Sequence, residues 1–205
     1  MSEEYKKKRR QEILDIARKV FIEKGFEHTT MTDIVEASGL SRGGVYQYFS
    51  STDEMFREIT NFNDHEHGDW IDQVIGESHT AWEALDRLLK ENEAGLLNDS
   101  IGFGIVQFEY FVNSTRREER AAYLNKRYNS AVQSFSKFIR HGVETGEFKP
   151  LQPIEAITLF IINVLDGTHL QRVMTLNHIG PADVYVVEQI DSLRMYLKQV
   201  LQVDS

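Results

Sequence analysis

The chain has no cysteine among its 205 residues, which excludes disulfide bonds, thiolate metal ligands and a cysteine nucleophile. It has only three prolines, and no apolar stretch approaches the roughly 18 residues that a membrane-spanning helix needs. The basic residues near its start are not followed by the apolar segment of a secretory signal. We therefore expect a cytoplasmic, mostly helical protein that makes no membrane contact.

Motifs of the common enzyme classes are also missing. The chain shows no nucleophile elbow, no phosphate-binding loop and no His-Glu-x-x-His motif. Its densest group of potential metal ligands is Asp64, His65, Glu66, His67 and Asp69. Because His65 and His67 would point to different sides of a helix, we favour a solvated cluster over a metal site. We expect no catalytic residue, no metal and no other cofactor.

The net charge of −9 argues at first against a nucleic-acid partner, but the charge is unevenly distributed. Residues 1–62 carry 10 basic and 11 acidic side chains, whereas residues 63–205 carry 13 and 21. The acidity therefore lies almost entirely in the later part of the chain. Five consecutive bases, from Lys6 to Arg10, either meet DNA phosphates or form a solvated tail.

Residues 30–49 have the pattern of two short helices joined by a tight corner. Thr32 is the expected N-cap of the first helix, with the negative charge of Asp33 in its first turn. Gly39 suits the left-handed backbone at the end of that helix, and Ser41 would cap a second helix running to Phe49. This geometry presents the second helix to a DNA major groove. An ordinary helical hairpin is the alternative interpretation.

The expected second helix carries no acid that would repel phosphate on its exposed N-terminal half, which holds Ser41, Arg42, Gly43, Gly44 and Tyr46. Each glycine lowers helix stability by about 1 kcal/mol relative to alanine. A close approach of the backbone to DNA would explain why glycine stands at both positions. The Arg42 guanidinium could pair with guanine in the major groove, or it could contact phosphate only.

Helical periodicity continues through the rest of the chain, and no alternating strand pattern of useful length occurs. We predict an all-α fold of about nine helices. The first 50 residues would form a three-helix, helix-turn-helix DNA-binding domain. A fourth helix over residues 52–70 would lead out of it into a second domain, which we take to span residues 51–205. Further helices are expected at 80–98, 101–113, 115–145, 153–176 and 182–203.

Residues 13–59 resemble the tetracycline-repressor (TetR) family of transcription regulators, in one unbroken register that includes ILDIARKVFIEKGFEHTTMTDIVEASGLSRGGVYQYFSSTDEMF. The resemblance implies a repressor that binds a palindromic operator on double-stranded DNA as a homodimer and is released by a small-molecule effector. It also implies that residues 51–205 form the effector-binding and dimerisation domain. A DNA-binding regulator that has no such effector and is controlled by a protein partner is the alternative. An enzyme is the third hypothesis.

Carried over by position, the resemblance implies DNA contacts by Thr32, Ser41, Arg42, Gly43, Gly44, Tyr46, Tyr48 and Thr52. Three of these residues depart from the family pattern. Gly44 stands where a threonine is often found, Tyr48 replaces a frequent histidine, and Thr52 replaces a lysine. The last change would remove one charge-assisted phosphate contact.

Aromatic residues are frequent beyond residue 62, and a helix bundle lined by rings can leave a cavity for an apolar or aromatic effector. Core packing is the alternative for each ring. The candidate pocket residues are Trp70, Trp82, Phe103, Phe108, Phe111, Tyr128, Asn163 and Asp166. Asn163, Asp166 and His169 recur every three residues on an otherwise apolar helix, where they serve either a ligand or a subunit interface.

The last two expected helices each carry a long apolar stripe. Pairing these stripes with those of a second copy would give a four-helix dimer interface. An entirely internal core is the alternative. The interface candidates are Ile157, Ile161, Val164, Ile190, Leu193 and Leu197.

Overall fold

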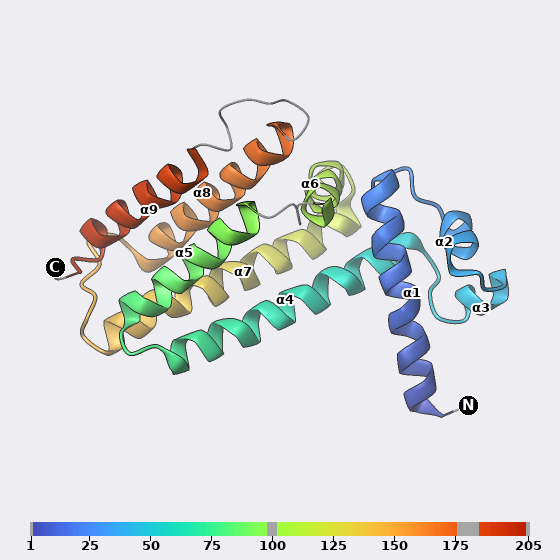
Figure 1. Ribbon diagram of the computed structural model, residues 1–205, viewed down its shortest axis with the longest axis horizontal. Coiled ribbons are helices and arrows are strands. Elements are labelled where there is room, and N and C mark those ends of the chain that lie inside the picture. Colours follow the sequence, from blue (N-terminus) through green and yellow to red (C-terminus); the bar gives the residue numbers. More distant parts are fainter. Residues whose placement is uncertain (1, 98–101, 176–184, 204–205) are drawn as a thin grey trace. The chain divides into compact units, whose positions relative to one another are not determined.

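The computed structural model describes residues 2–97, 102–175 and 185–203, and within these ranges every regular element is a helix (Figure 1). This confirms the all-α prediction. The helices are α1 (Glu3–Lys24), α2 (Met31–Ser38), α3 (Arg42–Tyr46), α4 (Thr52–Glu77), α5 (Ala81–Leu97), α6 (Gly102–Ser114), α7 (Glu118–Glu144), α8 (Ile154–Thr175) and α9 (Val186–Val200). No helix in the described ranges is long and apolar enough to cross a membrane.

The chain forms two compact units, each assembled from two separate stretches of sequence. The first unit comprises Met1–Glu66 and Gly102–Thr115, and the second comprises His67–Ile101 and Arg116–Ser205. This division differs from the expected boundary between residues 50 and 51. The reason is packing, because the first half of α4 and the whole of α6 share a core with the helix-turn-helix.

That shared core is a cluster of aromatic rings from four parts of the first unit. The Phe56 ring of α4 stacks on Tyr110 of α6 at 4.3 Å between centroids, and Tyr110 meets Phe26 edge-on at 4.7 Å. Phe21 of α1 lies 5.6 Å from Phe56. All four rings are buried. Because large rings contribute much of a core's burial energy, α6 is an integral part of this unit.

The helix-turn-helix begins two residues earlier than expected. Thr30, not Thr32, is the N-cap of α2: its hydroxyl accepts a hydrogen bond from the Asp33 amide at 3.2 Å, and the Asp33 carboxylate accepts one from the Thr30 amide at 2.7 Å. A capping box needs its acid three residues after the cap, so Asp33 selects Thr30. The left-handed Gly39, with a φ of 65°, is confirmed.

The second unit has a core built from α5, α7, α8, α9 and the later part of α4. The residues predicted for the dimer interface lie in this core. Ile157, Ile161, Ile190, Leu193 and Leu197 are at most 2% exposed, and Val164 packs against them. These five isoleucine and leucine side chains therefore pack inside one subunit, as in the alternative of an internal core, whereas Val164 is half-buried. On α8 the sequence is apolar on several sides and does not show which side faces inward. On α9 the apolar stripe is a single face, and that face belongs to the internal core.

Candidate nucleic-acid interface

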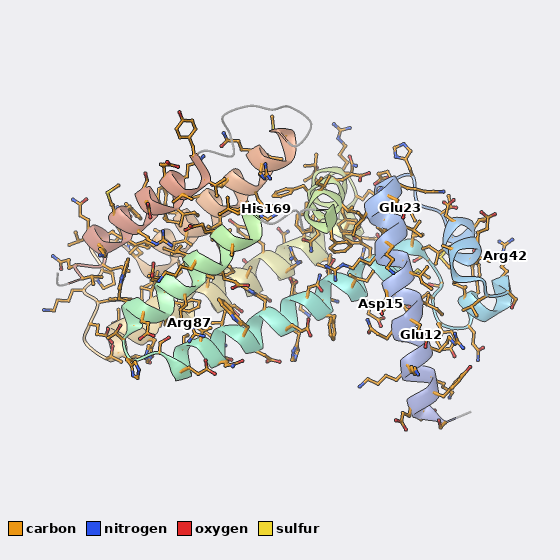
Figure 2. All side chains as sticks on the ribbon, in the orientation of Figure 1. Glu12, Asp15, Glu23, Arg42, Arg87 and His169 are labelled. Carbon is orange, nitrogen blue, oxygen red and sulfur yellow. The ribbon has the colours of Figure 1, made fainter. Side chains whose placement is uncertain are left out.

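The exposed face of α3 is the candidate DNA-reading surface. Ser41 caps the helix as predicted, and its hydroxyl accepts a hydrogen bond from the Gly44 amide at 3.1 Å. Val45 is fully buried and anchors the inner side of α3. Arg42 and Gly43 are exposed on the outer side, where Figure 2 shows the Arg42 side chain. A buried anchor on one side thus fixes which side chains are presented to solvent.

Arg42 and Tyr46 form a pair on this surface. The guanidinium carbon of Arg42 lies 5.3 Å from the centroid of the Tyr46 ring, and the tyrosine is 41% exposed. A guanidinium held over an aromatic face gains a modest cation–π attraction and loses part of its conformational freedom. The pair presents hydrogen-bond donors and a positive charge together, as binding to base edges or phosphates requires.

The two adjacent glycines have different surroundings. A side chain added at Gly44 would lie 3.3 Å from the Ser41 hydroxyl oxygen, so a small residue here leaves the cap undisturbed. A side chain added at Gly43 would meet nothing within 4 Å. Packing within the chain therefore does not explain why position 43 is a glycine.

The other predicted DNA contacts surround α3. Thr32 is exposed in the first turn of α2, and Thr52 is half-buried at the start of α4. Tyr48 is half-buried in the turn that follows α3, because the helix ends at Tyr46 and does not continue to Phe49. Tyr48 therefore lies on a connecting segment whose position other residues must fix.

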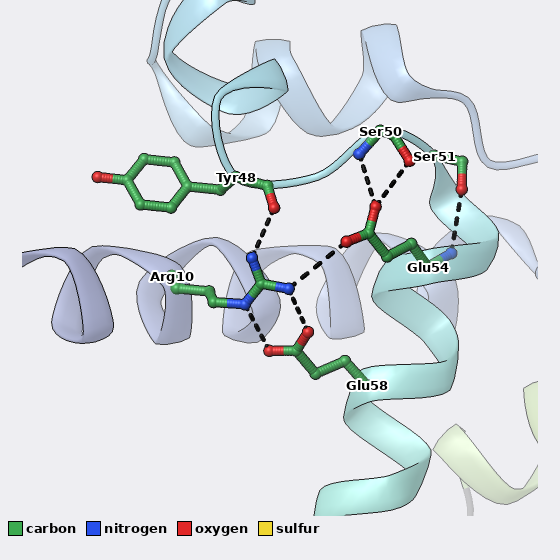
Figure 3. Close-up of polar contacts among 6 residues, drawn as sticks. All are labelled: Arg10, Tyr48, Ser50, Ser51, Glu54 and Glu58. Atoms are coloured by element: carbon green, nitrogen blue, oxygen red, sulfur yellow. Dashed lines mark hydrogen bonds and ion pairs between the residues drawn. The ribbon is translucent and has the colours of Figure 1, made fainter.

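The five consecutive bases differ in their exposure and in their contacts. Lys7 and Lys8 are exposed, but Arg10 reaches across to α4 and to the connection after α3 (Figure 3). Its Nε donates to Glu58 at 2.7 Å and its Nη2 donates to the other oxygen of the same carboxylate, in a bidentate pair. Its Nη1 donates to the backbone oxygen of Tyr48 at 2.6 Å. Arg10 is therefore not part of a solvated tail, because its guanidinium is paired within the first unit.

Two residues of α6 bind the helix-turn-helix unit directly. The Glu109 carboxylate accepts hydrogen bonds from the backbone amides of Phe26 at 2.9 Å and Glu27 at 3.0 Å. The Tyr110 hydroxyl donates to Asp53 at 3.1 Å and accepts from Arg57 at 3.2 Å, and burial raises its pKa. These contacts could not be predicted from the sequence, because they join residues more than 50 positions apart.

Comparison with known proteins agrees with this arrangement. The protein-family model described as "Bacterial regulatory proteins, tetR family" matches residues 13–59. A second family model, described as "Tetracyclin repressor-like, C-terminal domain", matches residues 84–178. The HTH-type transcriptional regulator YfiR of Bacillus subtilis is 43% identical over 204 residues, which span all of this chain and 97% of YfiR. The chain belongs to the TetR family.

More distant relatives and solved structures also cover most of the chain. The HTH-type transcriptional regulator QacR of Staphylococcus aureus is 25% identical over 170 residues, covering 78% of this chain and 86% of QacR. The crystal structure of FadR from Bacillus subtilis in complex with stearoyl-CoA covers 89% of this chain and 96% of that chain. It gives a TM-score of 0.73 at 20% identity. These relatives are transcriptional regulators, and this TetR-family chain is a regulator and not an enzyme.

The predicted effector residues of this TetR-family chain are split between the two units. Phe103, Phe108 and Phe111 are on α6 in the first unit. Phe103 is 4% exposed and lies 5.5 Å from the Phe56 ring, with the Arg18 guanidinium 5.0 Å from its centroid. Phe103 is therefore a core residue of the first unit, because its side chain is almost fully buried.

The remaining candidates lie in the second unit. Trp70 stacks on His67 at 5.4 Å, and His67 also lies 5.5 Å from Phe135. His67 is thus half-buried among rings rather than solvated, and the described residues contain no group of three or more potential metal ligands. Tyr128 is 45% exposed on α7, and Asn163 and Asp166 are exposed on α8, although partial burial of its carboxyl raises the pKa of Asp166.

Trp82 faces a different environment from Trp70. It lines an open groove of about 490 Å³ together with Asp86, Asp191, Arg194, Met195 and Lys198. The Lys198 ammonium lies 5.3 Å from the Trp82 ring centroid, and Arg194 is paired with Asp86 at 2.7 Å. Trp70 does not line this groove, although both tryptophans pack against the core of the second unit.

Proposed function

We propose that this chain is a repressor that binds a palindromic operator as a homodimer and leaves it when a small apolar or aromatic molecule binds the second unit. The observation that carries the proposal is the exposed α3 surface, where Arg42 and Tyr46 project from a helix anchored by buried Val45. Ser41, Gly43 and Gly44 would bring the backbone close to DNA. Thr32, Tyr48 and Thr52 would contact phosphates on either side.

The outward face of α8 supports a homodimer. Its residues recur with alternating spacings of four and three, which is a heptad pattern, and they are Ala156, Phe160, Asn163, Gly167, Leu170 and Met174. Phe160 and Leu170 are each 43% exposed, and Met174 is 70% exposed. A second copy of the chain would cover these side chains in the manner of a coiled coil. We name this set of six residues the outer stripe of α8.

The position of α6 supports control by an effector. This helix packs in the first unit, yet the helices that precede and follow it in the chain, α5 and α7, belong to the second. The rings of Trp70, His67 and Phe135 offer an apolar surface in the second unit. A ligand that favours a different placement of α5 or α7 would act on the DNA-binding unit through α6.

Binding to DNA tests the recognition surface. We expect Arg42→Ala and Tyr46→Ala each to abolish preference for an operator duplex selected from random-sequence DNA by the wild-type protein. Both side chains are exposed, so the fold and the dimer should be retained. Glu66→Ala, an exposed substitution away from α3, is the matched control. Unchanged operator affinity in both α3 variants would contradict the assignment.

Sedimentation tests the dimer. Leu170→Glu places a charge in the outer stripe and should yield monomers, because an unpaired charge at an apolar interface is costly. Leu151→Glu is the control, since Leu151 is 62% exposed but lies outside the stripe. A dimer that survives Leu170→Glu with unchanged affinity would place the interface elsewhere.

A further inference from the structure

We propose that Arg10 is a positioning residue for DNA recognition, which fixes the segment after the recognition helix and makes no phosphate contact itself. This inference rests on the proposed role of α3 as the recognition helix. In this proposal, Arg10 has a different role from the four bases that precede it in the sequence. Glu54 and Glu58, which face Arg10 from α4, hold its side chain in place.

Arg10 binds the connection between α3 and α4 at two successive residues. Its Nη1 donates to the backbone oxygen of Tyr48, which is two residues beyond the end of α3. Its guanidinium carbon lies 4.1 Å from the centroid of the Phe49 ring, which is 1% exposed. A planar guanidinium can make both contacts at once, whereas a lysine ammonium cannot reproduce the geometry.

Two carboxylates of α4 hold Arg10 in this orientation. Glu58 forms the bidentate pair, and Glu54 Oε1 lies 3.5 Å from Arg10 Nη2. The other oxygen of Glu54 accepts hydrogen bonds from the Ser50 amide at 2.8 Å and the Ser50 hydroxyl at 2.7 Å. Figure 3 shows the resulting chain of contacts from α1 through the connection to α4.

The surroundings of Arg10 disfavour a role in binding phosphate. One positive charge faces two negative charges, and Nε, Nη1 and Nη2 are all engaged with acceptors. The hydrogen bond to Glu58 raises the pKa of Arg10, as expected for a cation stabilised in place. Moving the side chain to a phosphate would leave Glu54 and Glu58 without their shared cation. Lys8 is exposed and has no acidic partner in the described part of the chain.

These two roles predict opposite effects for one substitution. If Arg10 positions the connection, Glu58→Gln weakens the clamp and therefore weakens operator binding. If Arg10 instead binds phosphate, Glu58→Gln removes a competing carboxylate and strengthens binding to any duplex. The sign of the change in affinity thus separates the two roles, without requiring Arg10 itself to be altered.

The experiment uses the full chain with two duplex probes, the selected operator and a scrambled duplex of equal length, over a series of salt concentrations. We expect Glu58→Gln and Arg10→Lys to weaken operator binding by about 10-fold or more, since each disturbs a hydrogen bond between charged groups. Affinity for the scrambled duplex should be unchanged. Arg10→Gln should likewise leave the slope of log affinity against log salt unchanged.

Lys8→Ala is the matched control from the same basic run. Loss of a phosphate contact should weaken binding to both duplexes and reduce the salt slope by about one per chain. All variants are compared at a temperature where circular dichroism shows them to be folded.

Three results would overturn the inference. They are tighter binding by Glu58→Gln, a reduced salt slope in Arg10→Gln, or an unchanged ratio of operator to scrambled affinity in Glu58→Gln and Arg10→Lys. A wild-type protein that prefers no duplex would instead contradict the proposed function. Failure of the proposed function is therefore distinguishable from failure of the inference about Arg10.

Discussion

The carboxylate of Glu109 on α6 accepts a hydrogen bond from the backbone amide of Phe26, 2.9 Å away and 83 positions earlier in the chain. The same carboxylate accepts a second bond from the Glu27 amide. These amides follow Gly25, the residue that ends α1. Glu109 therefore binds α6 directly to the loop that leads into the helix-turn-helix.

We predict that Glu109→Ala destabilises the first unit by about 1–3 kcal/mol, because two backbone amides lose their acceptor. Urea unfolding would measure the loss, and hydrogen exchange should show faster exchange of the Phe26 and Glu27 amides. The exposed Glu66→Ala should change neither quantity. Unaltered exchange at both amides in Glu109→Ala would show that this contact is not maintained in solution.

Gly43→Ala separates the needs of the fold from those of DNA binding. No atom lies within 4 Å of the added methyl group, so the protein should gain about 0.5–1 kcal/mol of stability from the smaller entropy of its unfolded chain. Operator binding should nevertheless weaken if the backbone of α3 approaches DNA closely. Gly68→Ala, also an open helical position, should stabilise without affecting DNA. Operator affinity at or above the wild-type value in Gly43→Ala would rule out that approach.

Asn163 is the one polar side chain in the outer stripe of α8. In coiled coils, a single polar core residue selects one register at some cost in stability. Asn163→Leu should therefore tighten self-association, as measured by the dimer dissociation constant in sedimentation equilibrium, while permitting more than one register. Asn125→Leu on α7, another exposed asparagine, should leave the constant unchanged. Weaker association in Asn163→Leu would mean that Asn163 makes a favourable contact across the interface.

Glu54 should make the first unit sensitive to acid. The hydrogen bond from the Ser50 amide holds the pKa of Glu54 below its usual 4.5. A carboxyl whose pKa is lower in the folded state stabilises the protein above the unfolded value, and this contribution is lost as the pH falls through the folded value. The stability difference between wild type and Glu54→Gln should thus be constant above about pH 5 and shrink below it. A difference that does not vary with pH would contradict this account.

Local chemistry made much of the helix-turn-helix predictable. Gly39 and Ser41 each act within a few residues of themselves, so a left-handed turn and a helix cap can be inferred from sequence alone. The cap of α2 was misplaced by two residues because Thr30 and Thr32 are chemically equivalent. Only the partner of Asp33 distinguishes them.

Contacts between distant residues could not be predicted in the same way. Arg10 looks like its four basic neighbours, and nothing nearby in the sequence indicates that Glu58 will bind it 48 positions later. The aromatic pattern of α6 was compatible with either a pocket or a core, and Phe103 belongs to the core. On α8, Ile157 and Phe160 are equally apolar, so periodicity could not show which of them is buried.

The membership of α6 in the first unit limits how this protein can be recombined. A fragment ending at Glu66 would lack Tyr110, whose ring covers Phe26 and Phe56. A chimaera that joins this helix-turn-helix to the second unit of a relative would therefore need to inherit α6 from the same parent, which takes three crossovers. The first unit is thus encoded by two separate segments of the chain, and a single crossover within α4 would place them in different parents.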